Sequence, residues 1–292
     1  MKIQSSKLTL FSPAKLNLFL RVLFKRRDGY HEIVSLMQAV SLLDVVHIGL
    51  ANEDRVTSTH LDLPSDTSNL VYRAVECFRL KTGLCFPVDI HIEKKIPIGG
   101  GCGGGSSNVA TTLWGLNLIC GNIFSQDMLR TWAGMVSCDA PFFFSSGTAY
   151  ATGRGENIKN LPPLRKKYLY LAVLNRGIST SMVYRQCTPS HFGLLPDPLH
   201  QLESVEYVND LEASAFTLCP TLAAVKQRLL YLGFKTVAMT GSGSSFFCLG
   251  PVEHLSVPGI ELIPISFLSR TENGWYTCAE HALAIYGHDH VH

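Results

Sequence analysis

Strict alternation of apolar and polar residues marks the first strongly patterned stretch of the chain. Between residues 15 and 22 the even positions are leucine or valine, while Lys15, Asn17, Phe19 and Arg21 occupy the odd ones. A period of two indicates a half-buried strand and places Lys15 and Asn17 side by side, about 7 Å apart along it. Other alternating or apolar runs predict strands over residues 7–11, 45–50, 88–92, 168–174, 236–239 and 246–249.

Helical spacing of apolar residues appears between capping residues. Asn69 suits the N-cap of a helix that runs to about residue 82 and ends at Gly83. Farther along, a helix is expected just after Ser106 and Ser107, and either serine is a good N-cap for it. The helices predicted in this way cover residues 69–82, 107–120, 126–135 and 220–232, with a further one beginning near residue 179.

Breaks in these patterns indicate how the chain is divided. The proline of Ser12-Pro13 is expected to stop the first strand, and the polar residues 52–68 are expected to form a loop. The segment Leu161-Pro162-Pro163-Leu164 has the composition of a linker. We therefore expect two domains, residues 1–160 and 161–292, that mix helices with strands.

Six glycines stand between residues 99 and 105, directly before a predicted helix. Glycine permits positive φ and has no side chain, so such a backbone can approach a ligand closely. A glycine loop that leads into a helix N-terminus favours phosphate, because free N–H groups and the helix dipole both point there. The lysine that a Walker A loop needs before its hydroxyl residue is missing. A phosphate cradle of another type is therefore expected rather than a flexible linker.

Composition narrows the classes of protein that fit. The 292 residues are 46% hydrophobic and 16% charged, enough for a sizeable core, and the net charge of +2 is too small to favour nucleic acid or an anionic membrane. No run of 18 apolar residues predicts a membrane span, and the N-terminus has no apolar signal region. Nine cysteines without CxxC spacing favour reduced thiols and a cytoplasmic location.

Two further segments carry candidate chemistry. Asp139 lies among small and aromatic residues, so its carboxylate is a functional candidate unless it merely caps a following turn. After the Asp28-Gly29 turn come Tyr30 and His31, which together can stack on a base and hydrogen-bond its edge. The alternative for this pair is a packed tyrosine beside a surface histidine.

Three motifs in order resemble those of the GHMP small-molecule kinases. They are Ser-Pro-Ala-Lys-Leu-Asn at residues 12–17, the glycine segment at 97–108 and Thr-Gly-Ser-Gly at 240–243. The resemblance implies an α+β, two-domain GHMP kinase fold with an N-terminal α/β domain, similar to a ribosomal-protein fold, and a C-terminal ferredoxin-like domain. The active site would lie in the cleft between them. ATP would be the phosphoryl donor, with Mg²⁺ bound largely by phosphate and water and no protein metal ligand identified.

The resemblance also implies roles for individual residues. Lys15 would face the transferred phosphoryl group, and Asp139 would take the proton of the acceptor hydroxyl. The residues implied to bind the nucleotide are Asn69, Leu70, Pro97, Ile98, Gly99, Gly100, Gly101, Cys102, Gly103, Gly104, Gly105, Ser106 and Ser107. Those implied to bind the second substrate are Asn17, Tyr30, His31, Thr180, Tyr184, Gly241 and Gly243.

The segment Asp28-Gly29-Tyr30-His31 resembles one branch of the family, whose small-molecule acceptor carries a cytidine diphosphate group. A monomer or homodimer is expected, with neither nucleic acid nor membrane as a partner. Another GHMP kinase, of the mevalonate or homoserine type, is the alternative within the family.

Two alternatives belong to other classes of protein. A nicotinamide-dependent oxidoreductase would use Gly99-x-Gly101-x-x-Gly104, but it needs an acidic residue about 20 positions later, and residues 118–125 contain none. A non-catalytic RNA-binding module is disfavoured by the low net charge.

Overall fold

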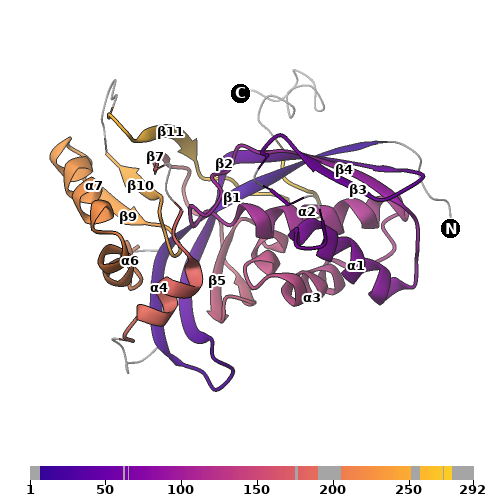
Figure 1. The fold of residues 1–292 in the computed structure, drawn as a ribbon, viewed down its shortest axis with the longest axis horizontal. Coiled ribbons are helices and arrows are strands. Elements are labelled where there is room, and N and C mark those ends of the chain that lie inside the picture. Colours follow the sequence, from indigo (N-terminus) through magenta and orange to yellow (C-terminus); the bar gives the residue numbers. More distant parts are fainter. Residues whose placement is uncertain are drawn as a thin grey trace.

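The computed structural model describes residues 7–61, 63–64, 66–174, 177–189, 205–250, 257–271 and 273–277. Within them the chain is a mixed α/β structure with two sheets (Figure 1). The larger sheet contains β1 (Leu8–Lys25), β2 (His31–Leu50), β3 (Arg55–Ser58), β4 (Val88–Glu93), β5 (Thr148–Gly153), β6 (Asn157–Asn160) and β8 (Val208–Asn209). The smaller sheet has the order β11 (Glu261–Ser266), β7 (Tyr168–Val173), β10 (Phe246–Leu249) and β9 (Thr236–Met239).

The larger sheet is built around the antiparallel hairpin of β1 and β2, which are 18 and 20 residues long. Its strand order is β3-β4-β2-β1-β8, and β5 pairs with another part of β2 and carries β6. The prediction that Ser12-Pro13 stops the first strand is wrong. The register shifts between Pro13 and Ala14, and such a bulge accommodates a residue that has no N–H for the ladder.

The larger sheet also differs from prediction at β2 and β3. Only residues 45–50 of β2 were predicted, because residues 33–40 are buried on both faces and therefore show no alternation. The prediction of a loop over residues 52–68 is wrong at β3, which pairs in parallel with β4. The four residues of β3 form a strand because they pair with β4, which is distant in the sequence, and a local pattern does not report this pairing.

The helices α1 (Leu70–Thr82), α2 (Gly104–Ile119) and α3 (Gln126–Val136) pack together beside the larger sheet (Figure 1). Both predicted caps of α1 are confirmed. The Asn69 Oδ1 accepts a hydrogen bond from the Val71 N–H at 2.9 Å, and Gly83, at φ 71°, donates from its N–H to the carbonyl of Arg79. Because capping depends on neighbouring residues alone, it was visible in the sequence.

The predicted start of α2 is wrong. The helix begins at Gly104, after Gly103 at φ 69°, so neither Ser106 nor Ser107 is its N-cap. The Ser106 hydroxyl is hydrogen-bonded to that of Ser137 at 2.7 Å, and Ser107 accepts a hydrogen bond from the Ser12 hydroxyl at 2.8 Å. Tertiary hydrogen bonds therefore use both serine side chains.

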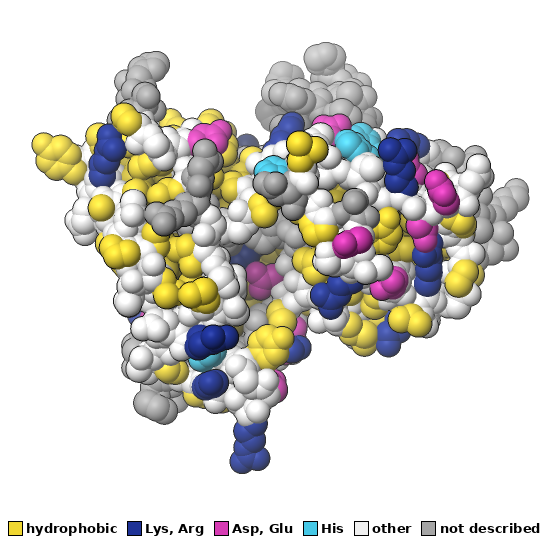
Figure 2. All heavy atoms as spheres, viewed as in Figure 1, with side chains coloured by type: hydrophobic (Ala, Val, Ile, Leu, Met, Phe, Trp, Pro, Cys, Tyr) yellow, Lys and Arg dark blue, Asp and Glu magenta, His cyan; other side chains and the backbone are white. Residues whose placement is uncertain are grey.

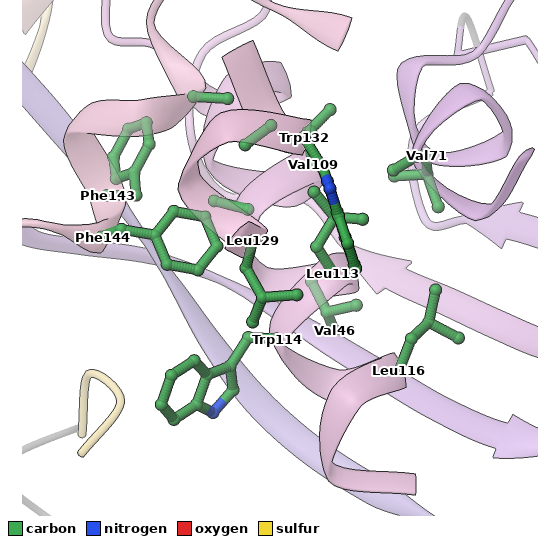
Figure 3. Packing of buried hydrophobic residues seen from close by; sticks show 14 of the residues in the cluster. Val46, Val71, Val109, Leu113, Trp114, Leu116, Leu129, Trp132, Phe143 and Phe144 are labelled. Carbon is green, nitrogen blue, oxygen red and sulfur yellow. The ribbon is translucent and has the colours of Figure 1, made fainter. Parts of the chain in front are cut away.

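The core of this half is centred on α2, which is apolar around most of its circumference because it lies among the sheet, α1, α3 and the 3₁₀ helix η1 (Ala140–Phe144). Figure 3 shows Leu113, Leu129 and Phe144 converging from α2, α3 and η1. Leu113 has no exposed surface. Truncation of such a leucine to alanine typically costs about 2–5 kcal/mol of stability.

The smaller sheet carries the helices α6 (Glu212–Leu218) and α7 (Pro220–Tyr231) on its outer side, and α4 (Thr180–Gln186) lies nearer the hairpin (Figure 1). β9 and β10 are antiparallel neighbours, so residues 240–245, which include the Thr-Gly-Ser-Gly motif, form the turn of a hairpin. The chain then returns to the larger layer, where Trp275 stacks on Trp114 with ring centroids 5.0 Å apart. The short β8, β11 and α6 were not predicted from the sequence.

None of the helices within the described ranges is long and apolar enough to cross a membrane.

Candidate active site

A cavity of about 990 Å³ extends from the glycine loop at residues 97–105 to the tip of the β1–β2 hairpin and to α4. Figure 2 shows the molecule hollowed at its centre, between the parts that hold the two sheets, with basic and acidic side chains visible inside. Elements from both halves of the sequence thus contribute to one site.

The glycine loop packs against the hairpin turn between β9 and β10. Gly101 has φ 78°, and an ideal Cβ placed on it would lie 2.0 Å from the carbonyl oxygen of Thr240. The backbone N–H of Ser245 donates to the carbonyl of Gly100 at 3.2 Å. Gly103, at φ 69°, leaves no room for a Cβ beside Lys15, whose Cγ would be 2.9 Å away. At these positions glycine is required by contacts within the protein, a reason that the sequence pattern did not reveal.

Lys15 and Asp139 meet inside the cavity. The Lys15 Nζ lies 3.1 Å from the Asp139 Oδ2 and donates to the Asn17 Oδ1 at 2.5 Å. The Lys15 side chain is only 4% exposed and that of Asp139 is 30% exposed. Asn17 is in turn held by Ser35, whose Oγ accepts from the Asn17 Nδ2 at 2.8 Å. The lysine is therefore fixed by its neighbours, and the carboxylate remains accessible from the cavity.

Asp139 is the residue before η1, where it could act as a cap. Its side chain makes no cap hydrogen bond, so the alternative of a purely local capping role is wrong. Gly155 faces the carboxylate, and an ideal Cβ there would lie 3.1 Å from the Asp139 Oδ1.

Aromatic side chains line the end of the cavity that is farther from the glycine loop. Tyr30 is 53% exposed and has the Arg154 guanidinium over its ring at 4.9 Å, whereas His31 is 8% exposed and stacks on Tyr184 with centroids 5.4 Å apart. The alternative of a packed tyrosine and a surface histidine is thus wrong, because the burial is reversed.

Burial also affects the protonation of these rings. Loss of solvent, and secondly the charge of Lys25, lower the pKa of His31 below its ordinary value of 6.5. Burial, with a smaller contribution from Asp139, raises the pKa of the Tyr184 hydroxyl. At neutral pH this end of the cavity therefore presents a neutral imidazole and a neutral phenol.

Most of the residues expected at the site line this one cavity. The exceptions are Ser107, which is buried against Ser12, and Gly243, beside which the Met239 sulfur leaves no space for a Cβ. The residues that line it as expected are Lys15, Asn17, Tyr30, His31, Asn69, Leu70, Pro97, Ile98, Gly99, Gly100, Gly101, Cys102, Gly103, Gly104, Gly105, Ser106, Asp139, Thr180, Tyr184 and Gly241.

Cys102 is the one member of the glycine loop that carries a thiol. Complete burial raises its pKa to about 11, against the opposing effect of Lys15, so the side chain stays a neutral thiol.

A buried polar network that the sequence pattern does not predict lies beneath the loop. Asp44, which has no exposed surface, pairs with Lys94 and accepts from the backbone N–H groups of Lys95 and Ile96 at 2.8 and 2.9 Å. Asn108 on α2 donates to the Asp44 Oδ2 at 3.0 Å and lies 3.3 Å from the Lys94 Nζ. The two lysines Lys94 and Lys95 just before the loop were the only sign of this network in the sequence, and they did not identify Asp44 on β2 as their partner.

Basic side chains near the hairpin were also missed. Lys25, Arg154 and Arg185 line the cavity. Among the described residues, no group of three or more His, Cys, Asp or Glu side chains is arranged to hold a metal ion.

Comparison with known proteins agrees with the geometry. Residues 69–147 match the family model for the GHMP kinase N-terminal domain. The chain is 44% identical over 269 residues to the 4-diphosphocytidyl-2-C-methyl-D-erythritol kinase of Protochlamydia amoebophila, covering 92% of each chain. It is 37% identical to the chloroplastic enzyme of that name from Arabidopsis thaliana, covering 93% of this chain and 76% of the relative.

The chain belongs to the 4-diphosphocytidyl-2-C-methyl-D-erythritol kinase family. A crystal structure of 4-(cytidine 5'-diphospho)-2C-methyl-D-erythritol kinase is similar, with a TM-score of 0.70 and 35% identity over 84% of this chain and 91% of that one. Homoserine kinase from Cytophaga hutchinsonii, at 19% identity and a TM-score of 0.65 over 87% of each chain, shares the fold.

The expected GHMP kinase family and fold are thereby confirmed, and the protein is a phosphotransferase that uses ATP. Membership of this family excludes the oxidoreductase and RNA-binding alternatives.

Proposed function

We propose that this chain transfers the γ-phosphoryl group of ATP to the 2-hydroxyl of 4-diphosphocytidyl-2-C-methyl-D-erythritol, giving the 2-phosphate and ADP. This step belongs to the non-mevalonate route to isopentenyl diphosphate. The observation that carries the proposal is the 3.1 Å pair of Lys15 and Asp139, which lines the same cavity as the glycine loop and the aromatic end. A donor and an acceptor bound at these two ends would meet at the pair.

The glycine loop and the start of α2 are proposed to hold the phosphates of ATP. Backbone N–H groups at this helix end lack intrahelical partners, and the helix dipole favours negative charge there. Asn69, Leu70, Pro97 and Ile98 line the cavity beside the loop and would enclose the rest of the nucleotide.

Mg²⁺ would neutralise part of the phosphate charge. The Ser106 hydroxyl, within the first turn of α2, adjoins the loop and is an oxygen donor suited to this ion. The remaining ligands would be phosphate and water oxygens, which Mg²⁺ commonly retains.

Phosphoryl transfer depends mainly on positioning and on neutralisation of charge. Asp139 would accept the proton of the 2-hydroxyl as the oxygen forms its bond to phosphorus and the bond to the ADP oxygen breaks. Lys15, held by Asn17, would place its ammonium group against the charge on the transferred group.

The second substrate is proposed to bind from the aromatic end. Tyr30 and Tyr184 offer ring faces to a cytosine, and the neutral His31 can hydrogen-bond its edge. Asn17 and Thr180 would contact the erythritol or diphosphate part, with Gly241 and Gly243 in the turn behind them. Thr180 is kept in place by a 2.8 Å hydrogen bond between its hydroxyl and that of Ser242.

Residues 1–160 and 161–292 would be the two domains, the protein would act in the cytoplasm as a monomer or homodimer, and its partners would be small molecules alone.

The test is an assay of ADP release by the purified protein with ATP and 4-diphosphocytidyl-2-C-methyl-D-erythritol, with mevalonate and homoserine assayed in parallel. We expect turnover with the cytidine substrate that exceeds turnover with the other two by at least about 10³-fold, because a site built for hydrogen bonds rejects compounds that lack them. Comparable or higher turnover with mevalonate or homoserine would overturn the proposal.

A further inference from the structure

Arg154 covers one face of the most exposed aromatic ring in the cavity. Its guanidinium carbon lies 4.9 Å from the centroid of the Tyr30 ring, which is 53% exposed. A guanidinium over a ring face is attracted by the negative face of the π system and lies flat against it. An exposed tyrosine near a hairpin tip otherwise has many rotamers, and this contact restricts them.

The guanidinium is itself fixed by its own turn. The Arg154 Nε donates to the Glu156 Oε1 at 3.1 Å, and the Arg154 backbone N–H donates to the Glu156 Oε2 at 2.5 Å. Gly153 and Gly155 on either side have φ of 75° and 113°. These values favour glycine, so the Gly153-Arg154-Gly155-Glu156 turn needs both glycines to present the arginine.

The two elements that carry Tyr30 and Arg154 are also joined to each other. The Gly153 N–H donates to the Glu32 Oε1 at 3.0 Å, and the other Glu32 oxygen pairs with Arg26 at 2.5 Å. On the other side of the hairpin tip, the Asp28 carboxylate accepts from Arg26 and from the Tyr30 N–H, both at 3.1 Å. Hydrogen bonds and ion pairs thus connect the tip of the hairpin to the turn after β5.

The same turn reaches the catalytic pair, because Gly155 faces the Asp139 carboxylate at the distance given above. One four-residue turn therefore reaches both Asp139, between the two ends of the cavity, and Tyr30, at its aromatic end.

We propose that Arg154 is a positioning residue for the second substrate: it supports one face of the Tyr30 ring so that the opposite face is held ready to stack on the cytosine. This inference rests on the proposed function, since it needs a substrate with a base. Arg154 acts through Tyr30 and sets the affinity for the cytidine substrate, while nucleotide binding at the distant glycine loop is independent of it.

The experiment is a double-mutant cycle of Arg154→Ala and Tyr30→Ala in the full-length protein, with KM measured separately for the cytidine substrate and for ATP. Arg154→Ala should raise the KM for the cytidine substrate about 3–10-fold and change kcat and the KM for ATP less than 2-fold. In the Tyr30→Ala background the same change should add less than 2-fold. Arg154→Lys keeps the charge without the flat guanidinium, so its KM should lie between those of the parent and Arg154→Ala.

Arg27→Ala is the matched control, because it removes a cation from the same hairpin at an exposed position outside the cavity lining. It should leave both KM values unchanged. An Arg154→Ala effect that persists in full without Tyr30 would mean direct contact between the arginine and the substrate, and would overturn the proposal. A lowered or unchanged KM would overturn it as well, because Arg154 would then cover the face that the base needs, or have no role. Failure of the proposed function is distinguishable, since the parent protein would then have no activity on the cytidine substrate.

Discussion

The carbonyl oxygen of Thr240 faces the α-carbon of Gly101 so closely that a methyl group on Gly101 would lie 2.0 Å from it. The two residues belong to different halves of the chain, and their contact joins the glycine loop to the turn between β9 and β10. Thr240 adds to this junction through its hydroxyl, which accepts from the Asn17 N–H at 3.1 Å. The positions of Asn17, the loop and the turn are therefore interdependent.

Gly101→Ala should consequently lower the free energy of unfolding by several kcal/mol. Gly121→Ala is the matched control, because Gly121 also has positive φ, 85°, but has no atom within 4 Å of its ideal Cβ. The free energy of unfolding of the control should fall by only about 1–2 kcal/mol, which is the cost of backbone strain at positive φ. Urea denaturation of both variants measures the difference, and equal losses would show that the loop and the turn can separate without cost.

Asp139→Asn should reduce kcat by about 10²-fold or more, because the amide keeps the size of the side chain but cannot accept the proton of the acceptor hydroxyl. The KM for ATP should change little. Asp127→Asn, on the exposed face of α3, is the control and should have normal turnover. Near-normal turnover of Asp139→Asn would remove the aspartate from the proposed chemistry.

Tyr30→Ala and His31→Ala should each raise the KM for the cytidine substrate and leave the KM for ATP nearly unchanged. Stacking of a base on an aromatic ring contributes about 1–3 kcal/mol, so the expected rise for Tyr30→Ala is about 5-fold to 150-fold. Steady-state kinetics with each substrate varied in turn gives the comparison. If Tyr30→Ala weakened ATP binding instead, the assignment of the two ends of the cavity would be reversed.

The KM for the cytidine substrate should depend on pH through His31. Because the pKa of His31 in the folded protein lies below 6.5, the neutral ring is the major form at pH 6.5 and the charged form gains only in more acidic solution. The KM should therefore change little above neutral pH and rise in acidic solution, because protonation removes an acceptor nitrogen.

The lowered pKa of His31 also makes the stability of the folded protein depend on pH. Between pH 6.5 and the lowered pKa, the unfolded chain binds more protons than the folded one, so the contribution of His31 to stability falls as the pH falls through this window.

Lys25→Gln removes the smaller cause of the lowered His31 pKa and should move the inflection in KM towards pH 6.5, whereas His31→Gln should abolish that inflection. An inflection that survived in His31→Gln would come from another group.

Local signals in the sequence were enough to predict the ends of α1, because both ends are capped by residues next to the helix. Asn69 and Gly83 act on their own neighbours, and both were predicted in place. By contrast, β2 is buried on both faces and offered no alternation over most of its length, and the single strand through Pro13 depends on a bulge against its partner. Features decided by a neighbour across the fold were the ones missed.

The candidate site shows the same division. The glycine loop was recognisable from the sequence as a phosphate site, but the joint role of Lys15 and Asp139 came only from the resemblance to a family. The stack of His31 on Tyr184 and the support of Tyr30 by Arg154 join residues from separate elements. No spacing along the chain reports such contacts, because they form only in the folded chain.

The network of Asp44, Lys94 and Asn108 beneath the glycine loop has a consequence for the thermodynamics of nucleotide binding. It connects β2, the end of β4 and the first turns of α2 through groups that are buried in the free protein. The helix end that would receive phosphate is thus preorganised, because its orientation is set by contacts that need no ligand. Binding of ATP should therefore involve little ordering of this wall of the cavity, and most conformational entropy would be lost by the nucleotide itself.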